Sequence, residues 1–262
     1  MPPPGPIKKV VAGKYFSLVL TEAGDLITFG DNSHGQLGDG TIQLSIDPKY
    51  LPRTNVLFER LFVDVAAGYE HVVVRTDDLR IFSWGRNTYG QLGDSTTTER
   101  HLPQPFIIVE QLSNLRFAHI AAGLHGSVAT TAEGRMYSCG DNRFGQLGDG
   151  SPFVSQPSKP VRVSLSNNCG SVSSLNVISI DGRDHSVLTL SNGRVYAWGQ
   201  NDLAEIGDGS TINKMSPTET DTTGVLANQR AIKVSAGYDH TLALTGNGLL
   251  ISQYTISYST TC

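Results

Sequence analysis

The run Asp184-His185-Ser186 contains the three side-chain types of a hydrolase triad. In such a triad the histidine takes a proton from the serine hydroxyl, and the carboxylate orients the imidazole. Consecutive residues at the start of a strand point to opposite faces of a sheet, so these three side chains cannot relay a proton. Equivalent places elsewhere in the chain hold Tyr15-Phe16-Ser17 and His125-Gly126-Ser127. We therefore interpret the run as structural and predict no catalytic residue.

Histidine and aspartate also recur with a regularity that invites a metal site. His71, His185 and His240 share one register, but they lie in separate repeats and would have to converge on a single point to bind zinc. Each glycine-rich loop also carries an aspartate near its end, at Asp39, Asp94, Asp149 and Asp208. These loops lack the alternating oxygen ligands and the terminal glutamate of a calcium-binding loop. The loops carry no lysine after the last glycine and open no helix, unlike phosphate-binding loops. We predict no metal and no cofactor.

The glycine-rich stretch Gly140–Gly150, with sequence GDNRFGQLGDG, determines how the chain is organised because it occurs four times. The other copies are Gly30–Gly40, Gly85–Ser95 and Gly199–Gly209, at intervals of 55, 55 and 59 residues. A fixed period of this size is typical of repeat architectures. The segment 164–175, rich in Ser, Asn and Gly, accounts for the longest interval.

Each repeat predicts four short strands joined by tight turns, because short apolar runs alternate with turn residues. In the first unit these are the run ending at Gly13, then Phe16–Leu20, Leu26–Phe29 and an outer segment around Pro52–Leu57. The equivalent second and third strands come in pairs, one pair for each of the next three units: His71–Val74 with Arg80–Gly85, Ser127–Thr130 with Arg135–Gly140, and His185–Leu190 with Arg194–Gly199. Lys159–Val163 supplies the outer strand of the third unit. The second unit places Leu79 where the other hairpin turns have glycine.

Three positions of the glycine-rich segment have predictable structural roles. One apolar residue anchors the loop to its unit (Leu37, Leu92, Leu147 and Ile206). One asparagine is expected to hydrogen-bond its own turn (Asn32, Asn87, Asn142 and Asn201). A buried wedge of varying size precedes the first glycine (Phe29, Trp84, Cys139 and Trp198).

A four-stranded unit cannot hide both faces of its own sheet, whereas radial stacking of units hides them. We therefore predict an all-β protein, a β-propeller of four-stranded blades with about four and a half repeats. The expected organisation is a Pro-rich lead at 1–7, units near 8–60, 61–115, 116–174 and 175–230, a partial unit at 231–248, and a divergent tail at 249–262. Beyond Gly248 the pattern fails, with Gln253 and Tyr254 in register where Trp198 and Gly199 stand.

The repeat motif resembles that of the regulator of chromosome condensation repeat family. Tyr69-Glu70-His71, Asp184-His185-Ser186 and Asp239-His240-Thr241 match its first half, and Gly90–Gly93 and Gly145–Gly148 match its second. The Gly-Asp-Gly-Ser/Thr ending is similar to the alpha-tubulin suppressor-like branch. The family fold is a seven-bladed propeller and this chain is too short for seven units, so the resemblance implies a truncated or partial member, which forms a partial seven-bladed propeller, an open arc or a smaller ring.

Composition limits the classes of partner. The net charge is −4, from 20 Lys+Arg and 24 Asp+Glu, which provides neither a basic surface for nucleic acid nor one for anionic membranes. Cys139, Cys169 and Cys262 have no CxxC spacing and an odd count, which favours a reducing compartment. We expect a cytoplasmic protein, with the nucleus as the alternative.

The function predicted first is a non-catalytic protein–protein interaction scaffold that binds a protein partner through variable inter-unit loops at 41–51, 95–103, 151–158 and 210–216. The partner-binding residues are unknown at this stage. The resemblance implies a second function, guanine nucleotide exchange on a small GTPase, and a third, chromatin association, which the net charge disfavours. Light sensing, which one plant branch shows, depends on clustered tryptophans, and this chain has only Trp84 and Trp198.

Overall fold

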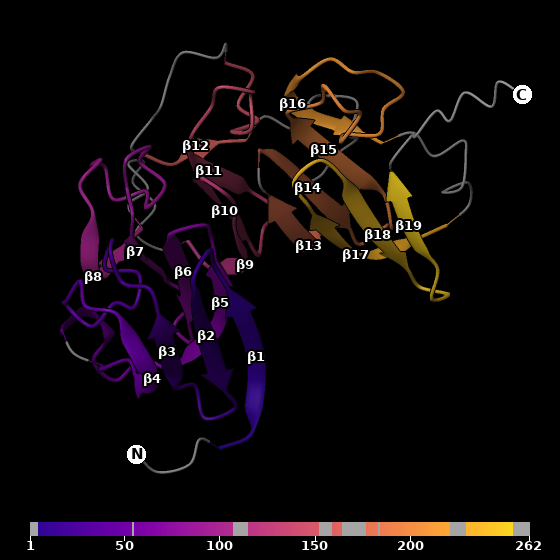
Figure 1. Cartoon of the computed structure of the whole chain (residues 1–262). Helices are drawn as coiled ribbons and strands as arrows, with labels where there is room; N and C mark the ends of the chain where they lie inside the picture. Colours follow the sequence, from indigo (N-terminus) through magenta and orange to yellow (C-terminus); the bar gives the residue numbers. More distant parts are fainter. Residues whose placement is uncertain are drawn as a thin grey trace, which may run out of the picture.

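The structure of the chain is a computed structural model that describes residues 5–53, 55–106, 115–151, 159–163, 177–182, 184–220 and 229–253. In these residues the protein is all-β, as predicted, and its strands form five antiparallel sheets arranged as blades of a β-propeller (Figure 1). The blades follow one another along the chain, and each sheet keeps its strands in sequence order from the innermost strand outwards.

The strands of the blades have the following bounds. Blade 1 comprises β1 (Ile7–Ala12), β2 (Phe16–Thr21), β3 (Leu26–Gly30) and β4 (Ser45–Tyr50). Blade 2 comprises β5 (Phe62–Ala67), β6 (His71–Thr76), β7 (Ile81–Gly85) and β8 (Arg100–Pro105). Blade 3 comprises β9 (Phe117–Ala122), β10 (Gly126–Thr131), β11 (Met136–Gly140) and β12 (Val161–Arg162). Blade 4 comprises β13 (Val177–Gly182), β14 (His185–Leu190), β15 (Val195–Gly199) and β16 (Lys214–Glu219). Blade 5 comprises β17 (Ala231–Ala236), β18 (Thr241–Thr245) and β19 (Leu250–Gln253).

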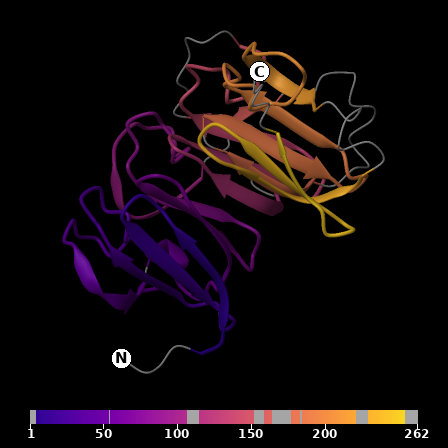
Figure 2. The same cartoon turned by 45° about the vertical axis from the view of Figure 1, so that its right-hand side comes forward.

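Consecutive blades are neighbours in space, as the colour gradient in Figures 1 and 2 shows. The innermost strand of each blade contacts the innermost strand of the next, in the order β1, β5, β9, β13 and β17. We call the side of a blade that faces the following blade its front face, and the side that faces the preceding blade its back face.

The hydrophobic core lies between blades rather than inside them. The first cluster joins the front face of blade 1, including Leu18 and Leu20, to the back face of blade 2, including Val72, Val74 and Trp84. Three further clusters join blades 2 and 3, blades 3 and 4, and blades 4 and 5 in the same way. Stacking therefore hides both faces of an inner sheet, as expected for a propeller.

The glycine-rich loops form hydrogen bonds to the next blade, a contact that the sequence did not reveal. Trp84 Nε1 donates to the Gln36 carbonyl at 2.9 Å, and Trp198 Nε1 donates to the Gln146 carbonyl at 2.9 Å, in each case in the loop of the preceding blade. Gly148 has a φ of 69°, and a Cβ there would lie 2.6 Å from Trp198 Nε1. The ninth loop glycine is therefore required by the tryptophan of the next blade as well as by the turn.

Several sequence predictions need correction. The outer strand of the first unit is Ser45–Tyr50, and the predicted segment at 52–57 contains instead the 3-10 helix η1, Asn55–Leu57. The predicted variable loop 41–51 contains the whole of β4, and the loops 95–103 and 210–216 contain parts of β8 and β16, because these exposed polar strands resemble loops in sequence. The fifth unit does not stop at Gly248 but forms β19, so there are five blades rather than about four and a half. The segment 164–175 and residues 152–158 lie outside the described residues.

Other predictions are confirmed. The outer strand β12 lies within Lys159–Val163. Leu79 adopts a φ of 63° in its hairpin turn, where Gly24 and Gly134 each have 78°. Gln253 pairs with Thr241 in the register in which Trp198 pairs with Ser186.

Candidate functional site

One end of the propeller gathers the connections between first and second strands together with the starts of the glycine-rich loops. Backbone hydrogen bonds fix this arrangement: Asp31 N donates to Tyr15 O at 2.8 Å, and Arg86 N donates to Glu70 O at 2.8 Å. In blade 3, Asp141 N donates to the carbonyl of His125 at 3.0 Å. Side chains far apart in sequence therefore share one surface.

Close backbone approach at the axis brings the connections of three blades together. Lys14 N donates to Tyr69 O at 2.9 Å, and Tyr69 N donates to Gly123 O at 3.2 Å. A Cβ on Gly68 would lie 2.6 Å from Gly123 O, so this crossing requires glycine. A cavity of about 440 Å³ opens here, lined by Ala12, Gly13, Lys14, Ala67, Gly68, Tyr69, Ala122, Gly123, Leu124 and Ala236.

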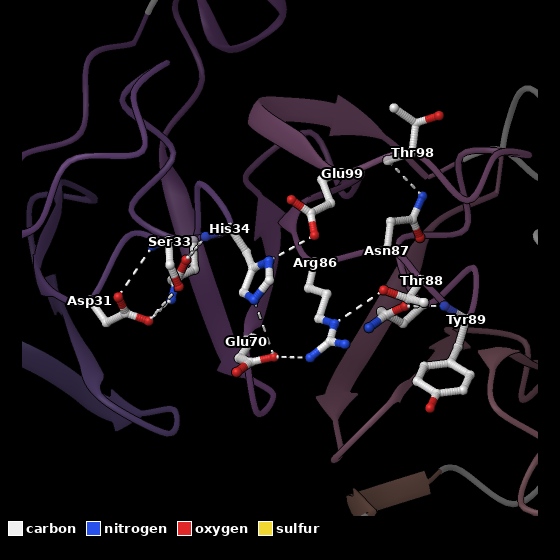
Figure 3. A network of polar contacts seen from close by, with 12 residues as sticks. Asp31, Ser33, His34, Glu70, Arg86, Asn87, Thr88, Tyr89, Thr98 and Glu99 are labelled. Atoms are coloured by element: carbon white, nitrogen blue, oxygen red, sulfur yellow. Dashed lines mark hydrogen bonds and ion pairs between the residues drawn. The ribbon is translucent and has the colours of Figure 1, made fainter.

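A charged network surrounds Glu70 beside this cavity, as Figure 3 shows. Arg86 Nη1 donates to Glu70 Oε2 at 2.6 Å, and Lys14 Nζ lies 3.5 Å from Glu70 Oε1. His34 Nε2 lies 3.7 Å from Glu70 Oε2, while its Nδ1 lies 2.7 Å from Glu99 Oε1. The network thus connects the loop of blade 1 with two segments of blade 2.

Glu70 is suited to hold its neighbours in place rather than to transfer a proton. Burial by itself raises the pKa of the Glu70 carboxyl, but the hydrogen bond from Arg86 and the charges of Arg86, His34 and Lys14 outweigh it and lower the pKa. Its side chain is only 9% exposed. A buried carboxylate beside Arg86 and Lys14 stays ionised and orients these two side chains.

Aromatic rings continue the surface into blade 3. Tyr89 stacks on His125 with ring centroids 4.6 Å apart, and Arg143 lies over the Tyr89 ring at 5.5 Å. Lys14 Nζ lies 4.7 Å from the Tyr69 ring centroid, and Tyr15 is 71% exposed. We call this combined surface the rim and define it as Lys14, Tyr15, His34, Glu70, Arg86, Tyr89, His125 and Arg143.

The predicted pseudo-triad is structural in the described residues. Ser186 Oγ donates to the Gln146 carbonyl of blade 3 at 3.4 Å, whereas His185 Nε2 lies 2.9 Å from Thr241 Oγ1 of blade 5. The two side chains therefore face opposite neighbouring blades, as expected for consecutive strand residues. His185 and Ser186 thus link blade 4 to its two neighbouring blades.

His71 and His185, two of the three histidines in shared register, each contact a hydroxyl of the following blade. His71 Nε2 lies 3.0 Å from Ser127 Oγ, whose hydroxyl proton goes to the Gln91 carbonyl at 2.7 Å. His71 therefore donates from Nε2 as a neutral imidazole, and the same argument applies to His185 because Thr241 Oγ1 donates to Glu205 O. Burial, together with nearby His125 and His240 respectively, lowers the pKa of His71 to about 3 and that of His185 to about 4.

The loop aspartates and asparagines hold turns. Asp39 Oδ1 accepts from Thr41 N at 2.9 Å and from Asn32 Nδ2 at 3.3 Å, and Asn32 Oδ1 accepts from Leu37 N at 2.9 Å. The loops at Asp94 and Asp208 repeat the pattern. The described ranges contain no group of three or more His, Cys, Asp or Glu side chains placed to hold a metal ion.

The tryptophans do not form a cluster. Trp84 lies between blades 1 and 2, and Trp198 lies between blades 3 and 4, each fully buried. Cys139 takes the equivalent place between blades 2 and 3, where its thiol lies 3.3 Å from the Gln91 carbonyl. Burial raises the pKa of this thiol, so it is not a nucleophile.

Sequence reasoning did not find the rim, although a signal for it existed. After a glycine shared by the units, the connections hold Lys14-Tyr15, Tyr69-Glu70, Leu124-His125 and Tyr238-Asp239. The residue types of these pairs differ between units, whereas the residues on either side of them repeat. The fold therefore does not determine which residues stand at these positions. Variable positions inside a fixed repeat are candidates for binding.

Comparisons with known proteins agree with this architecture. A family model described as "RCC1-like domain" matches residues 1–253. The chain is 30% identical over 240 residues to the Ultraviolet-B receptor UVR8 of Arabidopsis thaliana, covering 91% of this chain and 51% of the receptor. It is 35% identical over 214 residues to the human probable E3 ubiquitin-protein ligase HERC4, covering 80% of this chain and 19% of the ligase. The chain thus spans about half or less of the length of these relatives.

Solved structures share the fold. Human WBSCR16 aligns with a TM-score of 0.80 at 22% identity, over 94% of this chain and 59% of that one. Prp20p of Saccharomyces cerevisiae, whose structure is described together with its binding to Gsp1p and histones, aligns with a TM-score of 0.72 at 24% identity, over 90% and 55% of the two chains. Within the described residues, no helix is long and apolar enough to cross a bilayer.

Proposed function

Because this chain belongs to the RCC1-like domain family, we propose that it is a non-catalytic scaffold that binds a protein partner through the rim. The observation that carries the proposal is the concentration of exposed aromatic and cationic side chains around the axial cavity, fixed from three blades. Tyr and Arg are enriched in protein–protein interfaces, and they contribute most when they are pre-oriented.

The rim differs from an ordinary polar surface because its arginine side chains are held in fixed orientations. Arg86 is held by Glu70, and Arg143 is held at 2.6 Å by Asp141, a carboxylate that is itself buried. Side chains fixed in this way lose little conformational entropy on binding. The fitting partner is a protein surface that offers carboxylates and planar or apolar groups to the Tyr and Arg side chains.

The test is affinity capture of partners followed by quantitative mass spectrometry, with matched variants. Tyr15→Ala removes an exposed ring of the rim, and Phe58→Ala removes a similarly exposed ring at the opposite end of the propeller, before β5. We expect Tyr15→Ala to weaken capture of the specific partner by about tenfold or more, with Phe58→Ala unchanged. Equal capture by all three proteins contradicts the proposal.

Guanine nucleotide exchange is the second candidate, favoured by the fold shared with Prp20p and its recorded binding to Gsp1p. No residue of the rim provides a catalytic group for it, so exchange would operate by binding alone. The assay is release of fluorescent GDP from purified small GTPases, in which acceleration supports exchange and an unchanged rate rejects it. We also propose a cytoplasmic location, which the buried free thiol of Cys139 supports.

A further inference from the structure

The glycine-rich loop of blade 4 exchanges an acid and an amide relative to the loop of blade 1. In blade 1, Gln36 Nε2 donates to Asp31 Oδ2 at 2.7 Å, and Gln36 Oε1 accepts from His34 N at 2.8 Å. In blade 4, Gln200 stands at the repeat position of the aspartate and Glu205 at that of the glutamine. The loop therefore places a carboxylate where the other three loops have a side-chain amide.

The exchange leaves one buried carboxylate oxygen without a hydrogen bond. Gln200 Nε2 donates to Asp202 Oδ1 at 2.6 Å and not to Glu205. Glu205 Oε2 accepts from Leu203 N at 2.9 Å, whereas Oε1 has no partner among the described residues. Because Glu205 is 0% exposed, this oxygen destabilises the loop unless a donor reaches it.

Two further carboxylates lie near Glu205. Asp202 is exposed on the same loop, and Asp239 is half-buried in the connection between β17 and β18 of blade 5. Burial and then the charges of these two aspartates raise the pKa of the Glu205 carboxyl, against backbone hydrogen bonds that lower it. The ion pairs between described residues involve none of the three acids. We call Asp202, Glu205 and Asp239 the acidic site.

The spacing of the acidic site fits an extended organic cation better than a metal ion. The described ranges hold no group of three or more carboxylates placed around a single metal position. A guanidinium spreads five N–H donors over a planar fork and can reach separate carboxylates, whereas a lysine ammonium is a compact charge. Leu203, beside Glu205, is 51% exposed and offers apolar surface to the methylene groups of an arginine side chain.

We propose that the acidic site binds an arginine side chain of a protein partner, whose guanidinium donates to Glu205 Oε1. This inference rests on the proposed function, because the acidic site lies at the same end of the propeller as the rim. Asp239 stands at the repeat position of Glu70, and Asp202 at that of Arg143. The partner thus presents carboxylates to the arginines of the rim on blades 2 and 3 and an arginine to blades 4 and 5.

The experiment is an NMR titration of the 262-residue chain with Nα-acetyl-arginine amide, followed through the backbone amide signals of Leu203 and Asp239. The citrulline analogue has the same shape without the charge, and the lysine analogue has the charge without the fork. We expect saturable shifts with the arginine probe at a Kd of about 1 mM or below. The lysine analogue should bind at least about threefold more weakly, and the citrulline analogue should give no saturable shift.

Matched variants locate the binding. Glu205→Gln introduces the residue type of the other three loops, so the variant keeps its fold, which the urea unfolding midpoint checks. It should weaken binding of the arginine probe at least about tenfold, because the charge-assisted hydrogen bond is lost. The control Glu59→Gln makes the same change at an exposed residue at the opposite end of the propeller, before β5, and should leave the affinity unchanged.

Three results overturn the inference: no saturable shift in the wild type, equal affinity of Glu205→Gln, or equal binding of the arginine and citrulline probes. Equal binding of the lysine probe overturns the assignment of arginine. Capture of partners by Tyr15→Ala tests the rim separately. If that variant captures partners normally while the arginine probe still depends on Glu205, the proposed function fails and the acidic site stands. The converse result rejects the acidic site alone.

Discussion

The inner blades and the terminal blades have the same strand connections, yet they bury their second strands differently. In blade 4 every residue of β14 is buried, and in blade 2 only Arg75 of β6 is partly exposed. In blade 1 β2 alternates, with Ser17 and Val19 partly exposed, and β18 of blade 5 alternates in the opposite register. The difference shows that burial in this chain is set by neighbouring blades.

The joint between blades is therefore the unit of stability. Each joint combines one hydrophobic cluster with hydrogen bonds to the loop of the preceding blade. In repeat proteins of this kind, stability approximates a sum of unit and nearest-neighbour terms. Equivalent substitutions should cost more in an inner joint than at a terminal face. The first of four predictions tests this directly, and the other three test how the glycine-rich loops contribute to the inner joints.

The largest expected difference lies at the wedge position. Trp84→Ala removes a fully buried ring from the joint between blades 1 and 2 and should lower the free energy of unfolding by about 3–5 kcal/mol. Phe29 occupies the same repeat position on the back face of blade 1 and is only partly buried, so Phe29→Ala should cost about 1 kcal/mol. Urea unfolding of both variants measures the difference, and equal losses would falsify the comparison.

The loop glycines give the next effect. Gly148 and Gly209 have φ values of 69° and 77°, so alanine at either one costs about 1–2 kcal/mol from backbone strain. A Cβ at Gly148 also meets Trp198, which adds about 1–3 kcal/mol of overpacking, whereas at Gly209 nothing lies within 4 Å. In thermal and urea unfolding, the Gly148→Ala variant should be less stable than the Gly209→Ala variant. The reverse order of stabilities would show that Trp198 does not pack against the loop at position 148.

The loop of blade 4 contains an incompletely hydrogen-bonded carboxylate, because Glu205 stands where three other loops have glutamine. Glu205 is fully buried, and its Oε1 has no hydrogen-bond partner among the described residues, whereas Oε2 accepts from Leu203 N at 2.9 Å. Glu205→Gln should therefore raise the free energy of unfolding at neutral pH by about 1–2 kcal/mol.

The pH dependence of that gain provides its own control. Burial, with the charges of Asp202 and Asp239, raises the pKa of Glu205 despite opposing backbone hydrogen bonds. The folded chain then binds a proton that the unfolded chain has lost above about pH 4.3. The stability contribution of Glu205 is complete below that pH and falls as pH rises through the raised folded pKa. The advantage of Glu205→Gln should vanish near pH 4, and a constant advantage would contradict the explanation.

The smallest effect concerns Ala204, which has a φ of 65° at the loop position held elsewhere by Gly35, Gly90 and Gly145. Ala204→Gly relieves backbone strain but increases the freedom of the unfolded chain. The expected net gain is about 0.5–1 kcal/mol in urea unfolding. Ala132→Gly, in the turn between β10 and β11 of blade 3 and without positive φ, is the control and should give no gain.

Short apolar runs between turn residues predicted the inner three strands of the blades, because stacking buries these strands on both faces. This pattern failed for β4, whose sequence Ser45-Ile46-Asp47-Pro48-Lys49-Tyr50 is mostly exposed and contains a proline. An edge strand tolerates proline and charge, so its residues do not differ from those of a loop. The third strand of blade 5 was missed for a related reason, since it lacks a tryptophan and has Gln253 at that position.

The absence of a triad could be deduced from residue spacing, but the rim could not. Its members come from separate units, and Glu70 with Arg86 and His34 becomes a network only when the loops of blades 1 and 2 meet. Gly148 has a positive φ within its own loop, whereas its contact with Trp198 depends on the next blade. Contacts within a unit follow from the repeat, and contacts between units require the stacked structure.

The loop carbonyls described above have an evolutionary consequence. In each joint, side chains of one blade donate hydrogen bonds to a main-chain carbonyl oxygen in the loop of the preceding blade. These carbonyls belong to one loop position, at Gln36, Gln91, Gln146 or Glu205. The donors differ: Trp84, Ser127, Cys139, Trp198 and Thr241 all reach such an oxygen. Because no side-chain substitution deletes a carbonyl, mutation can change the donor while the acceptor persists. The donor residue of a unit can therefore change without loss of the acceptor in the neighbouring unit.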